Sequence, residues 1–318
     1  MGKRKVIPAN LRPRNGLNPT RVRLPDVEAT QVGRETQFET GLAYLQARFP
    51  DSADRISELV SNSEVYADNG EPINAQTPFQ PHTHLYLFRD PPTDEPIVQA
   101  LNNIEILYQD ENLLVIDKPH QVSVIPRGRW VTQTALVYLR NKLDMPGLAP
   151  VHRLDRPTAG VLVFTTNPEV RGAYQMLFQD RKVHKEYLAV TAAPPSGSEY
   201  PKTIRNRIVK VKGIARAQEV PGEINAETAI ELLGVKSEVA LWRLKPKTGK
   251  THQLRLHMNS IGFPIIGDPF WPEMRADLAG DPDPDPPLQL LAKVIEFIDP
   301  ITGEQRRFES RRSLNCWE

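Results

Sequence analysis

The stretch VHRLDRPTAG at residues 151–160 runs directly into VLVFT at residues 161–165, and together they decide the fold of this chain. The second half is a short apolar run of β-branched and aromatic residues, which predicts a buried strand. The first half predicts a loop in which the carboxylate of Asp155 lies between Arg153 and Arg156. Taken alone, an aspartate between two arginines is compatible with a simple ion pair, so its function depends on a second motif.

That second motif is KTGKTHQLRLHM at residues 247–258. The two segments together resemble the signature of the RluA-type pseudouridine synthases, which isomerise uridine in RNA. The family pattern is His-Arg-Leu-Asp before a Thr/Ser-Gly turn, then Thr-Gly-Arg/Lys-Thr-His-Gln-Leu/Ile-Arg further along. A third segment, KEYLA at residues 185–189, is similar to the family's Lys-x-Tyr-x-Ala. The resemblance implies a fold and an activity, which we state below as expectations.

Composition places the chain among ordinary globular proteins. It has 318 residues, enough for two domains, with 39% hydrophobic and 25% charged residues. Cys316 is the only cysteine, so neither a disulfide nor a cysteine-based metal site is predicted. No apolar run approaches the length of a membrane span, and no secretory signal is recognisable. We therefore expect a cytoplasmic monomer without a membrane partner or a metal.

Positive charge is unevenly distributed, although the formal net charge is only +1. The first 25 residues contain seven lysines and arginines and no acid, and residues 202–216 contain six and no acid. A basic run is often a solvated surface, but two of them in a near-neutral chain are typical of a polyanion-binding protein. The expected RNA contacts within them are Lys3, Arg4, Lys5, Arg205, Arg207, Lys210 and Lys212.

The order of patterns predicts three regions. Residues 1–34 are basic and proline-punctuated, which indicates a flexible arm or, as an alternative, a transit peptide. Residues 35–92 predict two helices and a hairpin, similar to a divergent form of the alpha-L RNA-binding module found in ribosomal proteins. The alternative is a small packing domain without RNA contact. Residues 97–312 predict many short strands, hence an α+β catalytic domain with a mixed, mainly antiparallel sheet and flanking helices.

Within the catalytic domain three helices are expected. The patterns predict helices at 134–143, at 167–179 with Met176, Leu177 and Phe178 facing inward, and at 251–260. The segment after the strand at 112–117 resembles the family's Asn-Lys-Pro-x-Gly, but His120 and Gln121 stand where a glycine is usual. That departure puts the shape of this wall in question.

The resemblance assigns the chemistry to three residues. Asp155 is the carboxylate at the sugar–base bond, and carboxylates are suited to trapping or stabilising a cationic sugar carbon. Arg255 pairs with it and keeps it ionised, because a buried carboxylate without a cation shifts toward its neutral form. Tyr187 lies against the uracil ring or relays a proton. Whether Asp155 attacks the sugar, attacks the base or removes a proton stays open.

The remaining site residues are expected to contact or position the substrate. Arg153 fills the gap left by a flipped base, Lys250 and His252 position the motif or a phosphate, and Lys118 contacts the substrate from the wall. His152 is expected to be structural. The isomerisation gains no atoms, so the resemblance implies no cofactor.

Three functions are compatible with these patterns. The leading one is an RNA pseudouridine synthase acting on structured RNA, ribosomal in preference to transfer RNA. The second is a non-catalytic RNA-binding protein on the same scaffold, against which the intact aspartate, tyrosine and arginine argue. The third is a glycosidase or nucleoside hydrolase, which needs a second catalytic carboxylate. No partner for Asp155 of that kind stands out in the sequence.

Overall fold

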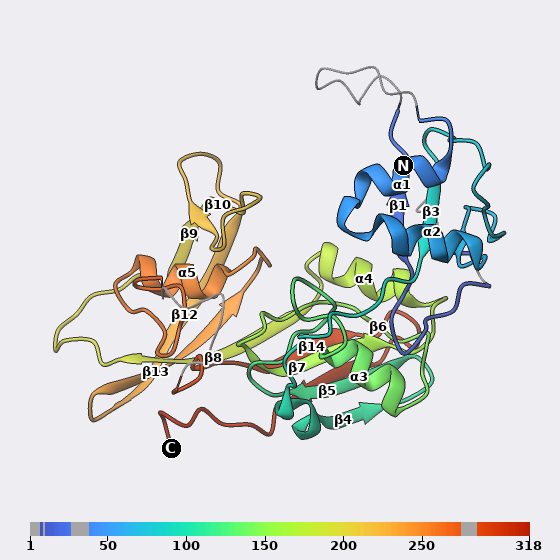
Figure 1. Cartoon of the computed structure of the whole chain (residues 1–318). Helices are drawn as coiled ribbons and strands as arrows, with labels where there is room; N and C mark the ends of the chain where they lie inside the picture. Colours follow the sequence, from blue (N-terminus) through green and yellow to red (C-terminus); the bar gives the residue numbers. More distant parts are fainter. Residues whose placement is uncertain (1–6, 9, 27–37, 275–284) are drawn as a thin grey trace. The chain divides into compact units, whose positions relative to one another are not determined.

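The computed structural model describes residues 7–8, 10–26, 38–274 and 285–318, and the chain divides into two compact units, Met1–Asp94 and Glu95–Glu318 (Figure 1). We call them unit 1 and unit 2. The elements of unit 1 are β1 (Thr20–Arg23), α1 (Gly41–Arg48), the 3₁₀ turn η2 (Pro50–Ser52), α2 (Ala53–Ser61), β2 (Val65–Tyr66) and β3 (His84–Leu87).

Unit 1 is a three-stranded antiparallel sheet, in the order β1-β3-β2, packed against two helices. Helix α1 begins where the Thr40 side chain accepts a hydrogen bond from the backbone N–H of Ala43. Its Leu45 packs with Leu59 of α2 and Leu85 of β3 in one apolar core. The predicted helices and strands of residues 35–92 are therefore present. The likeness to the alpha-L module stays a prediction.

The prediction that residues 1–34 carry little structure is wrong for residues 20–23, which form β1. Val22 and Leu24 are buried, whereas Arg21 and Arg23 are exposed. Such alternation is the period of a half-buried strand, and the surrounding prolines and basic residues obscured it. Residues 3–5, whose basic side chains were expected to contact RNA, lie outside the described residues.

Unit 2 is built on one ten-stranded sheet with the path β4-β5-β7-β14-β8-β13-β12-β9, to which β6 and β15 add at β7 and β14. The strands are β4 (Glu105–Gln109), β5 (Leu113–Lys118), β6 (Ala149–Pro150), β7 (Ala159–Thr165), β8 (His184–Ala192), β9 (Thr203–Asn206), β12 (Ala226–Lys236), β13 (Val239–Pro246), β14 (Leu290–Ile298) and β15 (Gln305–Glu309). A separate ribbon pairs β10 (Ile208–Val209) with β11 (Gln218–Glu219). The helices are η3 (Gln99–Asn103), α3 (Ala135–Lys142), α4 (Arg171–Gln179) and α5 (Gln253–Ser260).

Every pairing in this sheet is antiparallel except that of β7 with β14, which confirms the predicted mixed, mainly antiparallel α+β fold. Alternate residues of β5 and β7 face opposite sides of the sheet. Leu114 and Leu162 pack with α3 on one side. Val115 and Val163 pack with α4 on the other. Helix α5 covers a different part of the sheet, beside β12 (Figure 1).

The parallel pairing depends on Gly160, which has a positive φ of 111°. A Cβ atom there would lie 2.2 Å from the carbonyl oxygen of Ala292 on β14. Only glycine fits this close approach in this conformation. The Thr-Ala-Gly turn therefore fixes how the loop at residues 151–158 leaves the sheet.

Two predicted helices differ in detail from the structure. Helix α4 begins at Arg171 rather than at 167, because Asn167 instead closes a local turn by accepting the backbone N–H of Glu169. Met176 was predicted to face inward, but it is 45% exposed, and Tyr174 takes the inward position. Helix α5 begins at Gln253, after a left-handed residue.

No helix in the described ranges is long and apolar enough to cross a membrane.

Candidate active site

A broad pocket in unit 2 brings the sequence motifs together. The loop at 151–158, residues 246–255 and Tyr187 of β8 all line it. Nine lysines and arginines line the pocket, whereas Asp155 is the only acid among its lining residues. The basic residues are Arg127, Arg129, Arg153, Arg156, Arg181, Lys185, Lys247, Lys250 and Arg255. This charge pattern suits a polyanion with one reactive carboxylate at its centre.

Arg255 holds the two ends of the site together from helix α5. Its Nε and Nη2 atoms donate to the two carboxylate oxygens of Asp268, each at 2.7 Å. Its Nη1 donates to Oδ2 of Asp155 at 3.1 Å. The guanidinium also lies against the rings of Phe270 and Trp271, at 4.9 and 5.4 Å from their centroids. The predicted Asp155–Arg255 pair is thus formed in the structure.

The environment of this pair differs on its two sides. Arg255 is 2% exposed, and although burial lowers its pKa, the charges and hydrogen bonds of Asp268 and Asp155 outweigh burial and raise the pKa. The Asp155 side chain is 30% exposed. No described residue donates a hydrogen bond to its second oxygen, Oδ1. That oxygen is therefore available to a bound substrate.

Asp268 is the residue that sequence reasoning missed. It follows Gly267 in a turn, and the sequence motifs assigned no role to it. Its side chain is fully buried, and both oxygens are occupied by Arg255. Asp268 therefore cannot serve as the second catalytic carboxylate that a glycosidase requires. It orients Arg255 instead.

Tyr187 lies on β8 between β13 and β14, opposite Leu244 and Ala292. Burial and the negative charge of Asp155 raise the pKa of its phenol above the usual range. The hydroxyl is therefore protonated at neutral pH and can donate a hydrogen bond in the pocket. Its placement against the substrate ring stays a prediction.

Gln253 explains why a glutamine follows the histidine in the second motif. Its Nε2 donates to the hydroxyl of Thr228 on β12 at 2.9 Å, and its Oε1 accepts from Thr248 at 2.8 Å. The same oxygen accepts the backbone N–H of Lys250 at 3.0 Å. The glutamine therefore ties the start of α5 to the sheet, and with it the position of Arg255.

Arg153 and Lys250 both line the pocket and are exposed. No hydrogen bond or ion pair of Arg153 occurs with the rest of the described chain, so its guanidinium is available to a ligand. His252 has a different position. It adopts a left-handed φ of 56°, its Nδ1 accepts the backbone N–H of Ala217 at 3.3 Å, and burial lowers its pKa to about 4. A neutral His252 positions the loop rather than binding a phosphate as a cation.

Lys118 does not line the pocket, contrary to the prediction that it contacts substrate. It is fully buried, and its Nζ donates to the carbonyl oxygens of Pro119, Val122 and Arg156 at 2.9 to 3.1 Å. Burial lowers its pKa to about 7. The side chain therefore fastens the wall segment to the Asp155 loop from behind.

In the wall segment after β5, Gln121 adopts the backbone conformation expected of the glycine that is usual there. It has a φ of 63°, in the left-handed region where a glycine carries no steric penalty. The backbone thus keeps the glycine-like turn, and the doubt about the shape of this wall is resolved. His152 behaves as predicted, since its Nε2 accepts the backbone N–H of Val163 and burial lowers its pKa to about 3.

Lys185 was quoted only as part of a motif, but it also lines the pocket, where burial lowers its pKa. The RNA contacts expected of the basic segment 202–216 stay a prediction. Arg205 is paired with Glu227 at 2.9 Å, Arg207 donates to the carbonyl of Pro221, and Lys210 donates to Ile214. These residues and Lys212 do not line the pocket, although Ala215 of the same segment does. The described residues contain no cluster of side chains suited to a metal.

Comparisons with known proteins agree with this geometry. The family model for RNA pseudouridylate synthase matches residues 112–260. Pseudouridylate synthase RPUSD2 of Homo sapiens is 33% identical over 180 residues, covering 56% of this chain and 32% of that protein. The dual-specificity RNA pseudouridine synthase RluA of Salmonella typhi is 30% identical over 216 residues, covering 64% of this chain and 91% of the relative.

The fold has a counterpart among solved structures. Human RNA pseudouridylate synthase domain containing 4 superposes with a TM-score of 0.51 and 27% identity, over 68% of this chain and 90% of that one. The chain thus spans about a third of the length of the human curated relative and nine tenths of the bacterial one. On these matches, and on the motif residues gathered in one pocket, this chain belongs to the RluA-type family of RNA pseudouridine synthases.

Proposed function

We propose that the protein is an RNA pseudouridine synthase that isomerises specific uridines in structured RNA, ribosomal in preference to transfer RNA. The observation that carries this proposal is that only one of the two carboxylate oxygens of Asp155 accepts a hydrogen bond from a side chain of the protein. One of its oxygens is held by the buried Arg255, and the other is open to a pocket lined by nine cations. Cations of that number neutralise phosphates, and the open oxygen is available for the reaction.

The reaction breaks the bond from ribose C1′ to uracil N1, rotates the base, and forms a bond from C1′ to uracil C5. The proton on C5 leaves, and N1 gains one, so the atoms balance without a co-reactant. Asp155 supplies the carboxylate for bond cleavage, because it is the only acid among the described residues that line the pocket. Once the new bond has formed, the freed carboxylate can also accept the C5 proton.

Tyr187 and Arg153 have supporting roles in this proposal. The protonated phenol of Tyr187 donates to the uracil while it turns, and its ring limits the directions in which the base can move. The exposed Arg153 occupies the space that a flipped uridine leaves in its stack, which offsets part of the unstacking free energy of a few kcal/mol. Arg255 and Asp268 hold the carboxylate still throughout.

The test is release of tritium from RNA labelled at uracil C5. Total bacterial RNA is incubated with the wild-type protein, with Asp155→Asn, and with Asp144→Asn as a matched control. Asp144 is an exposed aspartate that does not line the pocket. We expect release by the wild type and the control, and none by Asp155→Asn. If neither the wild type nor the control releases tritium while both bind folded RNA, the non-catalytic alternative is favoured.

Separate ribosomal and transfer RNA pools in the same assay decide the substrate preference. Charge reversal is the appropriate test of the amino-terminal contacts, because deleting residues 1–34 would also remove β1 from the sheet of unit 1. We propose that Lys3, Arg4 and Lys5 contact RNA. Substituting all three by glutamate should weaken RNA binding and reduce its salt dependence, without abolishing isomerisation of a short stem-loop.

A further inference from the structure

A short basic turn at the rim of the pocket is not used by the chemistry above. Arg127 and Trp130 close it with reciprocal backbone hydrogen bonds of 2.8 and 3.2 Å. Gly128 at its tip has a φ of 60°, and no atom lies within 4 Å of the place a Cβ would occupy. The tip therefore projects into open space, while Arg127, Arg129 and Trp130 line the same pocket as Asp155.

The base of this turn is held firmly by Glu95. Its carboxylate accepts the backbone N–H groups of Val131, Thr132 and Gln133 at 2.6 to 2.9 Å, and the hydroxyl of Thr132 at 2.7 Å. Burial opposes ionisation of Glu95, but these hydrogen bonds outweigh burial and lower its pKa. The turn is thus presented on a fixed support, although its tip is exposed.

The turn is linked directly to the catalytic loop through Trp130. The guanidinium of Arg156, the residue after Asp155, lies 4.9 Å from the centroid of the indole ring. Nη1 of Arg156 also donates to the carbonyl of Gln121 at 3.2 Å. The guanidinium of Arg129 lies 5.4 Å from the same ring. The indole ring therefore lies against a side chain of the Asp155 loop, that of Arg156. The ring is only half-buried.

An indole beside three arginines has the chemistry of a single-strand RNA contact. Bases stack on aromatic rings and on guanidinium planes, and arginines neutralise the adjoining phosphates. A base inside a continuous duplex has both faces covered by its neighbours, so only an unpaired or displaced base can stack on Trp130.

We propose that the turn at residues 127–130 is a stacking platform for an unpaired base next to the target uridine. The substrate of this enzyme therefore presents, next to its uridine, a base that is unpaired or displaced from its stack. This inference rests on the proposed function for its biological meaning. Its physical content, a stacked base on Trp130, is measurable by binding alone.

The experiment uses the full-length protein and a short RNA hairpin whose loop carries one uridine next to 2-aminopurine. A second hairpin has an abasic position in place of the 2-aminopurine. The wild-type protein should bind the first hairpin about tenfold more tightly than the second, and should quench its fluorescence. Trp130→Leu should bind both hairpins equally and leave the fluorescence unquenched, whereas Trp130→Phe should keep most of the difference.

Trp317→Leu is the matched control, because Trp317 is also half-buried but lies outside the pocket. It should discriminate between the two hairpins as the wild type does. Thermal unfolding of each variant shows whether it is folded. The platform is overturned if folded Trp130→Leu retains the tenfold difference, or if the wild type shows none.

This result is separable from the proposed function. Quenching and discrimination that depend on Trp130, without tritium release from any RNA, would support the platform and count against the isomerase. Tritium release by a protein that does not discriminate between the hairpins would support the isomerase and overturn the platform.

Discussion

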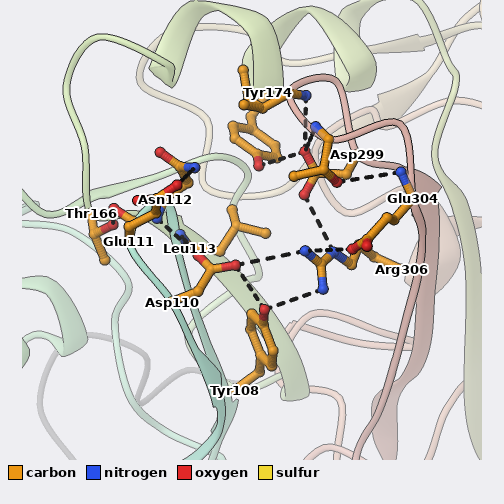
Figure 2. Close-up of polar contacts among 12 residues, drawn as sticks. Tyr108, Asp110, Glu111, Asn112, Leu113, Thr166, Tyr174, Asp299, Glu304 and Arg306 are labelled. Atoms are coloured by element: carbon orange, nitrogen blue, oxygen red, sulfur yellow. Dashed lines mark hydrogen bonds and ion pairs between the residues drawn. The ribbon is translucent and has the colours of Figure 1, made fainter.

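Among the described residues of unit 2, Arg255 and Arg306 each bind carboxylates from two separate parts of the chain, and only Arg255 belongs to the site. Arg306 on β15 donates from Nε to Asp299 at 3.4 Å and pairs with Glu304 at 3.0 Å and Asp110 at 3.8 Å. It also donates to the hydroxyl of Tyr108 at 3.2 Å (Figure 2). This cluster joins the turn after β4 to the turn before β15, just as Arg255 joins the Asp155 loop to the Asp268 turn.

The two regions differ in whether the remaining carboxylate oxygens accept hydrogen bonds. Oδ1 of Asp299 accepts the hydroxyl of Tyr174 and the backbone N–H of Ile301, each at 2.9 Å (Figure 2). Oδ1 of Asp155 accepts no hydrogen bond within the described part of the chain. A carboxylate whose oxygens are all occupied stabilises the fold, whereas one with an open oxygen is free to react. Ion pairing alone does not tell the two apart.

The largest expected effect comes from removing the arginine of the site. Arg255→Met leaves Asp268 buried without a cation, which should lower the free energy of unfolding by about 3–5 kcal/mol and abolish isomerisation. The double variant Arg255→Met/Asp268→Leu should recover most of the stability, because apolar side chains replace both partners, but none of the activity. Urea unfolding and tritium release measure the two effects. Recovery of activity by the double variant would contradict the role given to Arg255.

Asp299→Asn should give the opposite result in the other cluster. Loss of the charge weakens the hydrogen bonds from Tyr174, Ile301 and Arg306, so we expect a loss of about 2–3 kcal/mol in stability. Activity per folded molecule should stay at the wild-type level. Asp155→Asn is the counterpart, with activity reduced by a factor on the order of 10³ or more and stability nearly unchanged. The comparison fails if Asp299→Asn lowers kcat at a temperature where the variant is fully folded.

Acid should also distinguish the two regions, because the region of the site contains buried histidines that are neutral in the folded protein. Burial lowers the pKa of His257 on α5 to about 4 and that of His152 to about 3, against about 6.5 in an unfolded chain. Below about pH 6.5 the unfolded state binds protons that the folded state does not, so stability falls as pH is lowered. Between pH 7 and 5 each histidine should contribute a loss of about 2 kcal/mol.

His257→Gln tests this expectation through unfolding curves at several pH values. The variant should lose less stability than the wild type between pH 7 and 5, and the two profiles should run parallel above pH 7. Identical slopes in acid would show that His257 is not held neutral in the folded state.

Glu304→Gln should have the smallest effect. The Glu304 side chain is 64% exposed, and exposed ion pairs contribute little because water and salt screen them. We expect a change below about 0.5 kcal/mol in unfolding free energy and no change in activity. A larger loss would mean that Arg306 depends on its exposed partner as much as on the buried Asp299.

Much of the fold could be predicted because its strands and helices have local signals. The apolar run at 161–165 is buried on both faces and forms the middle of the sheet, as its lack of alternation indicated. The strand at 20–23 was missed because its alternation is short and lies among prolines. Helix α4 was placed too early because an asparagine before a proline signals a turn as readily as a helix start.

The roles of site residues that belong to a motif could be predicted from the sequence. Roles that depend on a partner far away in the chain could be predicted less well. Asp155, Arg255 and Tyr187 are brought together as expected. The role of Asp268 depends on where helix α5 places Arg255, which no local pattern reveals. The burial of Lys118 and the neutrality of His252 likewise depend on tertiary packing. A motif indicates that a residue matters but not whether it faces the substrate.

The position of β14 has a consequence for how the enzyme is made. This strand lies between β7, which follows the Asp155 loop, and β8, which carries Tyr187. The two halves of the site are therefore joined through residues 290–298, synthesised long after either of them. A nascent chain that ends before these residues holds every catalytic side chain and still has no assembled pocket. The site is therefore expected to assemble only after residues 290–298 have been made, and a product that ends before them should lack activity.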